Sequence, residues 1–259
     1  RRSFFHDYMD TMNQSAGNAA LDLFEYLRDY TDYDVNLIWQ NALRAMTLAD
    51  LVKNLHLDFV LPANTGVPIP DGRRVALVMH LYYMDLLDKT LEYARSMPEG
   101  CDFIFTVGSE ENAKLVRERC KGLPYNVDVR VIQNRGRDVS ALLIGAGKDC
   151  MKYDYVCFAH DKKVTQLSPY SIGDGFAYKC FENILGSKAL VSNIINHFEQ
   201  DPHAGVLAPT PPNHADYFGN FASLWGPNYE GTKKMLEETL GVKVPLDPHK
   251  EPIAPMGTM

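Results

Sequence analysis

From residue 74 onward, short apolar runs alternate with longer segments in which apolar residues recur at helical spacing. The apolar runs at residues 75–79, 103–107, 127–132 and 155–159 predict strands. These strands start near residues 75, 102, 128 and 154, a regular spacing that is typical of successive β-α units. We therefore predict an α/β fold, with a mostly parallel, Rossmann-like sheet and helices on both of its faces.

The segments between and after these runs predict helices at residues 85–96, 110–120, 139–150 and 232–240. Another amphipathic helix follows Gly186-Ser187. Its apolar stripe is predicted to belong to the core and consists of Leu190, Val191, Ile194, Ile195 and Phe198. Residues 205–208 predict a fifth strand, and residues 209–227 an irregular loop that lines the binding cleft.

The first 60 residues have helical periodicity only, and residues 61–72 are rich in proline and glycine. We therefore predict an N-terminal helical annex with its linker at residues 1–72, and an α/β domain at residues 73–259. The chain ends without a polar tail after Met259, so we expect this domain to continue in a longer protein.

Composition narrows the function classes. The formal net charge of −7 over 259 residues argues against generic nucleic-acid binding. The longest apolar run, residues 75–84, is too short to span a bilayer. The 5 cysteines are odd in number and lack C-x-x-C spacing, which favours reduced core thiols and a cytoplasmic location.

Two polar clusters follow predicted strands directly. The first comprises Asn134, Arg135, Gly136, Arg137 and Asp138, and the second His160, Asp161, Lys162 and Lys163. Because the carboxyl ends of parallel strands face one crevice, we expect both clusters to line it. Arginines and lysines around one crevice favour a phosphate or diphosphate ligand. The alternative is that both clusters are solvated turns whose charges form surface ion pairs.

The second cluster also indicates whether the site needs a divalent metal ion. Nucleotide-sugar transferases with a Rossmann-like sheet place an Asp-x-Asp motif at such a strand end to hold a divalent ion. Here His160 and Lys162 stand at the outer positions, and a lysine can neutralise a diphosphate directly. We expect no cofactor and no metal, with a divalent cation held by Asp161 and either Asp138 or Asp174 as the open alternative.

Further candidates come from single positions. His80 ends the first predicted strand together with Tyr82 and Tyr83, where an aromatic ring can stack on a nucleotide base, although a histidine there is often only a core residue. A transferase needs a carboxylate base for the acceptor hydroxyl. Asp174, on a predicted hairpin-like turn between two glycines, and Asp216, in the long loop, are the candidates, with Asp161 weaker. The alternative for Asp174 is that it is only a turn residue.

Several pieces of the chain occur together in one family pattern: Leu55–Pro62, Val75–Tyr83, Asn134–Asp138, His160–Lys163, Leu185–Ser187 and Gly257–Met259. They resemble the rhamnan synthesis protein F family, regarded as glycosyltransferases of bacterial rhamnose-rich cell-wall polysaccharides. The resemblance extends from about residue 36 to the end, and it departs at Asp161, where the family tends to have Thr.

This resemblance implies a glycosyltransferase-A-like fold, a nucleotide-sugar donor such as TDP-rhamnose, and a growing or lipid-linked glycan as acceptor. It also implies an inverting rhamnosyltransfer, in the cytoplasm or at the inner face of the membrane. The expected donor-binding residues are His80, Tyr82, Asn134, Arg135, Gly136, Arg137, Asp138, His160, Lys162 and Lys163. The alternative function is a non-catalytic, transferase-like module that binds glycan or a partner enzyme.

Overall fold

The computed structural model describes residues 19–45, 60–163, 171–202, 204–209, 229–239, 241 and 243. The chain divides into two units, one of residues 1–60 and 213–255 and the other of residues 61–212 and 256–259. The first unit contains the helices α2 (Ala19–Tyr30), α3 (Val35–Ala45) and α12 (Tyr229–Thr239). The predicted helical character of the N-terminal part is confirmed for α2 and α3, whereas the domain boundary near residue 72 stays a prediction.

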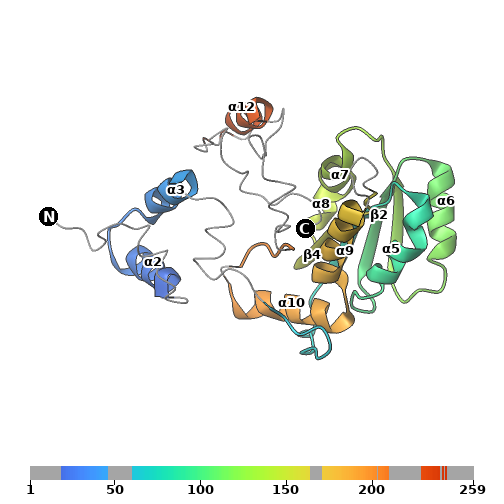
Figure 1. Ribbon diagram of the computed structural model, residues 1–259, viewed down its shortest axis with the longest axis horizontal. Coiled ribbons are helices and arrows are strands. Elements are labelled where there is room, and N and C mark those ends of the chain that lie inside the picture. Colours follow the sequence, from blue (N-terminus) through green and yellow to red (C-terminus); the bar gives the residue numbers. More distant parts are fainter. Residues whose placement is uncertain are drawn as a thin grey trace. The chain divides into compact units, whose positions relative to one another are not determined.

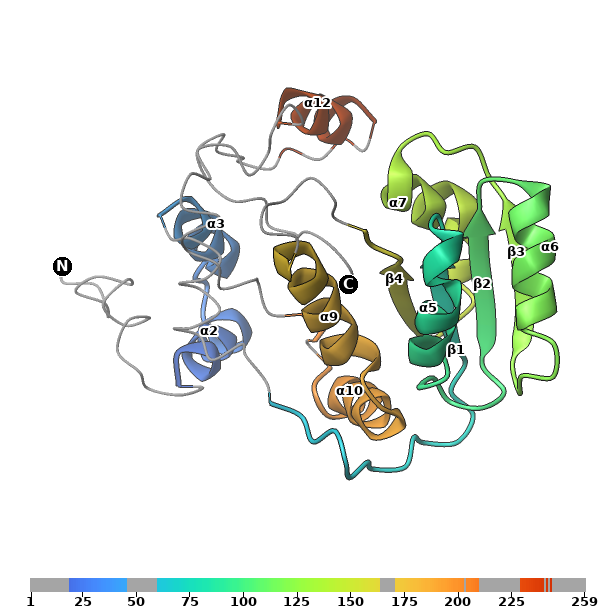
Figure 2. The same ribbon diagram turned by 45° about the vertical axis from the view of Figure 1, so that its right-hand side comes forward.

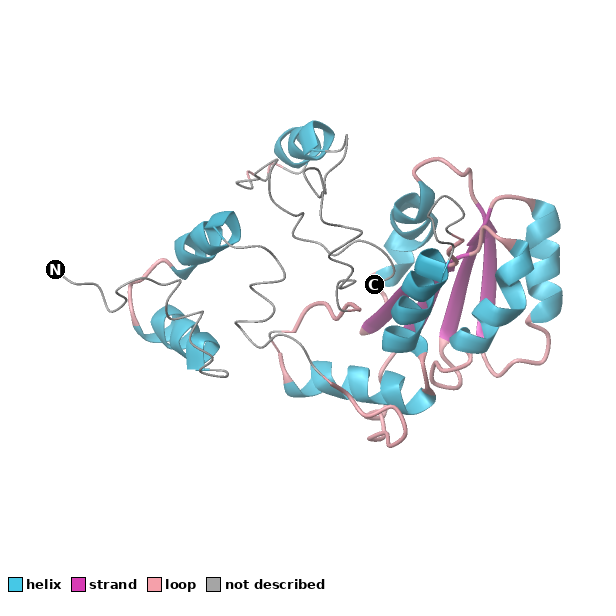
Figure 3. Ribbon diagram, in the orientation of Figure 1, coloured by secondary structure: helices cyan, strands magenta, loops and turns pink. Residues whose placement is uncertain are grey.

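The second unit has a sheet that contains, within the described residues, β1 (Val75–His80), β2 (Asp102–Val107), β3 (Asn126–Val131) and β4 (Tyr155–His160). The strand order is β3-β2-β1-β4, and all neighbouring strands are parallel (Figure 3). Every residue of β1 is buried, as expected of a central strand covered on both faces. The predicted α/β fold with a parallel sheet is therefore confirmed.

One face of the sheet is covered by η1 (Met84–Leu86), α5 (Leu87–Ala94), α6 (Glu110–Arg119), α9 (Ser171–Leu185) and α10 (Lys188–Gln200) (Figure 1). The side chains of Ser109 and Ser187 cap α6 and α10, because each accepts a hydrogen bond from a first-turn N–H. The predicted core stripe of α10 is buried at Leu190, Val191 and Ile195. Phe198 is half-buried and stacks on Tyr155.

The other face carries a smaller apolar cluster, formed by β-strand residues and by a helical segment of three parts. These parts are α7 (Arg137–Ser140), the π-helix η2 (Ala141–Ala146) and α8 (Gly147–Cys150). The helix predicted at residues 139–150 is thus present, with one wide turn in its middle. Figure 2 shows α7 at the end of the sheet where β3 leads into it.

Two local predictions are wrong. Residues 204–209 form no strand, and Val206 is 70% exposed, so that its side chain does not contribute to a core. The Gly173-Asp174-Gly175 sequence is not a hairpin-like turn but part of the helix α9. Glycine is only a weak helix breaker, and the surrounding helix overrides its preference here.

The segment predicted as a linker, residues 61–72, is bound along α10. Asn193 donates through Nδ2 to the carbonyl oxygens of Pro62 and Thr65, and its Oδ1 accepts from the N–H of Val67. Asn196 donates to the carbonyl oxygens of Val67 and Pro68. Two buried side-chain amides therefore satisfy the polar backbone of a segment that has no regular structure of its own.

Candidate functional site

The order of the strands marks one position in the sheet. The chain runs from β1 through β2 to β3 on one side, and then crosses to β4 on the other side of β1. The β1–β2 connection packs on one face and the β3–β4 connection on the opposite face. Open α/β sheets bind ligands in the crevice outside the carboxyl ends of the two strands where the order reverses. In this protein those strands are β1 and β4.

A row of polar side chains crosses the sheet at this end. His80 ends β1 and is paired in register with Thr106 of β2 and His160 of β4. Two residues earlier, the same registers and the same face hold the apolar row of Phe158, Val78 and Ile104. The polar row therefore lies directly beyond an apolar one, at the carboxyl ends of three adjacent strands.

His80 is held firmly in this row. Its Nδ1 lies 2.9 Å from Oγ1 of Thr106, and the two residues are 5% and 0% exposed. Burial lowers the pKa of His80, and the nearby charge of Asp138 opposes that effect. Gly145 of η2 packs over Thr106 so closely that a Cβ on it would lie 2.8 Å from the threonine methyl group.

The orientation of His160 follows from its hydrogen bond. Its Nδ1 lies 3.0 Å from the carbonyl oxygen of Asp161, which can only accept. Nδ1 therefore donates, and the neutral ring has its lone pair on Nε2. Nε2 lies 3.8 Å from Oδ2 of Asp138, at the start of α7. Burial lowers the pKa of His160 to about 4, although the Asp138 carboxylate favours the charged ring.

Asp161 is a buried carboxyl group with 5% exposure. Its Oδ2 accepts hydrogen bonds from the N–H groups of Tyr82 and Tyr83, at 2.8 and 2.5 Å. Its Oδ1 is buried and has no hydrogen-bond partner in the part of the chain that is described. Burial raises the pKa of Asp161 to about 6, against the effect of the two N–H donors. The carboxylate thus fixes the backbone that follows β1 and retains an unsatisfied acceptor atom.

Two lysines follow Asp161. Burial lowers the pKa of Lys162, and the positive charge of Arg137 acts in the same direction, so that the two cations lie near each other. Lys163 donates from Nζ to Oδ2 of Asp85 at 2.6 Å, and the same Nζ lies 5.9 Å from the centre of the Tyr83 ring. The β4 end and the loop after β1 are therefore joined by charge as well as by hydrogen bonds.

The Asn134–Asp138 turn has an unusual backbone. Gly136 has φ of 95° and Arg137 has φ of 53°, which is the left-handed region. A Cβ on Gly136 would lie 2.9 Å from Cβ of Ser140, so glycine is required by both conformation and space. Arg135 and Arg137 are exposed, and neither forms an ion pair with another described residue. Such strain in a non-glycine residue is concentrated at functional sites.

The structure brings most of the predicted donor-binding residues together. His80, Tyr82, Asp138 and the His160–Lys163 segment are linked by the contacts above, and Arg137 lies near Lys162. Asn134 and Arg135 are exposed residues of the adjoining turn. Of the predicted catalytic carboxylates, Asp161 is in this site and Asp174 is in α9, where its side chain is not described. Asp216 lies outside the described residues.

Sequence reasoning missed two residues of the site. Thr106 lies within hydrogen-bond distance of His80, and Asp85 accepts a hydrogen bond from Lys163. Thr106 carries a visible signal, because it is a polar residue near the end of an otherwise apolar run. Nothing in the sequence pattern distinguishes Asp85 from other acidic residues at helix starts.

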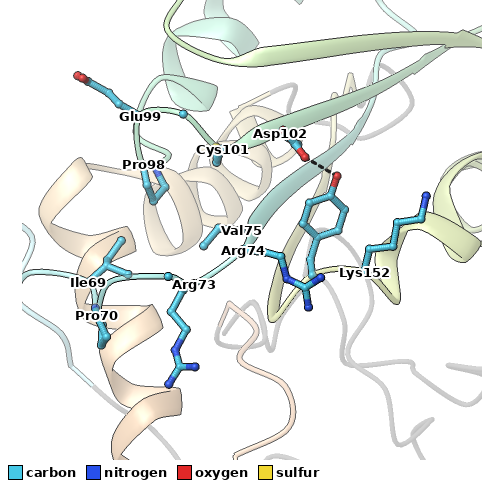
Figure 4. Close-up of a pocket in the computed structure, with 13 residues that line it drawn as sticks. Ile69, Pro70, Arg73, Arg74, Val75, Pro98, Glu99, Cys101, Asp102 and Lys152 are labelled. Carbon is cyan, nitrogen blue, oxygen red and sulfur yellow. Dashed lines mark hydrogen bonds between the residues drawn. The ribbon is translucent and has the colours of Figure 1, made fainter.

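A separate cavity of about 480 Å³ lies at the opposite, amino end of the strands, where β1 and β2 begin (Figure 4). Its charged lining residues all have partners: Arg73 with Glu199, Arg74 with Asp154, Glu99 with Lys188, Asp102 with Tyr153, and Lys152 with Asp149. Because each charged side chain already has an ion-pair or hydrogen-bond partner, we assign this cavity a structural role.

The described residues provide neither a metal-binding cluster nor a membrane-spanning helix. They contain no cluster of three or more His, Cys, Asp or Glu side chains suited to hold a metal ion. Among the same residues, no helix is long and apolar enough to cross a bilayer. The expectation of a metal-independent site stays a prediction.

Comparison with known proteins adds one result. The model of the family described as rhamnan synthesis protein F matches residues 1–259, including the first 35 residues, to which the resemblance noted above did not extend. No curated protein and no solved structure matches the chain at a significant level.

Proposed function

The chain belongs to the rhamnan synthesis protein F family, and from this membership together with its polar strand-end site we propose that it is a glycosyltransferase. The family places the protein in rhamnan synthesis, and hence in polysaccharide biosynthesis. In this proposal the donor is a nucleotide-activated sugar, with TDP-rhamnose as the first candidate. The acceptor is a growing or lipid-linked glycan on the cytoplasmic side of the membrane, and the transfer inverts the anomeric centre.

One observation carries this proposal: polar and charged groups are buried together at the carboxyl ends of β1 and β4. His80, His160, Asp161 and Lys162 all have displaced pKa values there, and burial is the largest cause in each case. Burial of ionisable groups lowers stability unless they are fully paired, so their concentration at one crevice favours a binding or catalytic role.

The charges suit a diphosphate. Lys162, Lys163 and the two arginines of the Asn134–Asp138 turn can neutralise the donor without a metal ion, and exposed guanidiniums offer forked donors to phosphate oxygens. Tyr82 is 49% exposed beside His80 and offers a ring on which the base can stack. The strand order β3-β2-β1-β4 is that of the first four strands of a nucleotide-binding sheet, which supports a glycosyltransferase-A-like fold.

The base that activates the acceptor was expected among Asp161, Asp174 and Asp216. Asp161 is the one of the three with a described side chain, and two N–H donors already occupy one of its oxygens. Its role in this proposal is therefore to position the Tyr82 and Tyr83 backbone around the donor.

Calorimetry with TDP and UDP tests the proposal, followed by a screen of several nucleotide sugars for hydrolysis of the donor. We expect saturable binding of at least one nucleotide and release of that nucleotide from its sugar. Absence of any nucleotide binding, with retained binding of rhamnan oligosaccharides, would instead indicate a non-catalytic glycan-binding module.

A further inference from the structure

We propose that His160 and Asp138 form the pair that takes the proton from the acceptor hydroxyl, which makes His160 the catalytic base of the transfer. This inference rests on the proposed function. It assigns to the acceptor two residues that sequence analysis grouped with the donor site.

The geometry of the pair is the first argument. Nδ1 of His160 donates to the carbonyl oxygen of Asp161, so the lone pair is on Nε2. Nε2 and Oδ2 of Asp138 face each other across 3.8 Å, and both are acceptors when the ring is neutral. A hydroxyl group that lies beside this pair, rather than on the line joining the two atoms, can donate to Nε2 at ordinary hydrogen-bond length while its oxygen remains free to attack.

The position of the pair is the second argument. The His160 side chain is 13% exposed and that of Asp138 is 28% exposed, so both are partly reachable from solvent. His160 ends β4 beside His80, at the strand-order reversal, and Asp138 lies in α7, which covers this end of the same face. The acceptor would thus enter between the helical segment and the sheet, next to the cations proposed to hold the donor.

Charged groups around the ring explain how the base is activated. Lys162 and His80 disfavour a proton on His160, whereas Asp138 favours one. Burial keeps the ring neutral before the substrates bind, so the lone pair is available. A bound diphosphate would offset the positive charge of Lys162, and this raises the basicity of His160 after the donor has bound.

The transfer needs no reactant other than the donor, the acceptor and the side chains named above. The acceptor oxygen forms a bond to the anomeric carbon, and the bond between that carbon and the diphosphate oxygen breaks. The electron pair leaves on the nucleoside diphosphate, whose charge is met by Lys162 and Arg137. The acceptor proton moves to Nε2 of His160, and Asp138 stabilises the resulting imidazolium until it returns the proton to water.

The test compares His160→Gln with His197→Gln, a control in α10. The probe is TDP-rhamnose, or whichever nucleotide sugar the screen selects, with TDP release measured with and without a rhamnose oligosaccharide. We expect kcat of His160→Gln to fall by about 10²–10⁴-fold, as is typical when a general base is lost. Its affinity for TDP should stay within about threefold of the wild type, and the control should keep its kcat.

Two further readouts separate a base from a structural role. Added imidazole should restore part of the turnover of His160→Ala, and Asp138→Asn should shift the acidic limb of the kcat–pH profile to lower pH. Normal turnover in a His160→Gln protein that still binds TDP would overturn this inference and leave the proposed function standing. Wild-type protein that binds no nucleotide would remove the proposed function instead.

Discussion

The two ends of the sheet differ in how their charged side chains are paired and buried. At the amino end, the cavity is lined by charged side chains, and each of them has an ion-pair or hydrogen-bond partner. At the carboxyl end, His80 and Asp161 are buried and His160 and Lys162 half-buried, all four with displaced pKa values, and one oxygen of Asp161 has no partner among the described residues.

This difference shows why the shape of the surface alone misleads here. The amino end has a cavity of about 480 Å³, but each of its charged lining residues already has a partner, so an added anion would have to displace existing partners. At the carboxyl end, burial disfavours the charged forms of His80, His160, Asp161 and Lys162. Ionisable groups with such displaced pKa values are concentrated at functional sites, which favours a ligand here.

We expect the largest difference in turnover when a lysine is substituted at one end of the sheet or at the other. We predict that Lys162→Ala lowers turnover by more than about a hundredfold, because the charge that balances the diphosphate is lost. Lys152→Ala, at the amino end, should leave turnover within about twofold. Turnover of the wild type should also survive EDTA. Activity that EDTA abolishes and manganese restores would contradict a metal-independent site.

Arginine substitutions at the two ends of the sheet should differ in their effect on nucleotide affinity, by a smaller factor than the lysine substitutions differ in turnover. Arg135→Ala and Arg137→Ala are each expected to weaken nucleotide binding by about ten- to a hundredfold, which corresponds to roughly 1.5–3 kcal/mol for a charge-assisted contact. Arg74→Ala at the amino end serves as the control and should bind nucleotide normally. If all three variants bind alike in calorimetry, the turn does not contact the donor.

The smallest expected effect is on the free energy of unfolding. A buried carboxyl group at the carboxyl end lowers this free energy at high pH, whereas a paired one at the amino end raises it. The pKa of Asp161 is raised from 3.8 to about 6, so the native state keeps its proton up to about pH 6 while the unfolded chain loses it near pH 4. The free energy of unfolding therefore falls as pH rises through this window, by roughly 3 kcal/mol at most.

Asp161→Asn removes this cost, and we expect it to raise the free energy of unfolding at pH 8 by about 1–2 kcal/mol, since its amide nitrogen would also need a partner. Asp154, at the amino end, has a pKa lowered by its hydrogen bond from the N–H of Arg74, so Asp154→Asn should destabilise at the same pH. Denaturant unfolding at pH 8 measures both. A destabilised Asp161→Asn would show that the buried carboxylate serves folding.

Much of this fold is readable in the sequence, because apolar runs and helical spacing report burial directly. The four strands, the helices between them and the polar clusters at two strand ends all follow from that pattern. The pattern does not report which strands are neighbours. For that reason the adjacency of His80 and His160, which the register of β1 with β4 creates, could not be predicted.

The missed features depend on tertiary contacts. The turn expected around Asp174 is helical, because its glycines fall within α9. The proline-rich stretch before β1 reads as a free linker, yet Asn193 and Asn196 bind it through its backbone, and backbone acceptors leave no mark in a sequence. The same holds for Asp161, whose partners are the N–H groups of Tyr82 and Tyr83 rather than their side chains.

The central claim is that a nucleotide binds at the carboxyl ends of β1 and β4, and histidine NMR during a TDP titration tests it most directly. With signals assigned from single His→Gln variants, the imidazole resonances of His80 and His160 should shift saturably, while that of His197 should not. A pH titration of the TDP complex should show the pKa of His160 raised from about 4 in the free protein. Saturable TDP binding that leaves the imidazole resonances of both His80 and His160 unchanged would contradict the account.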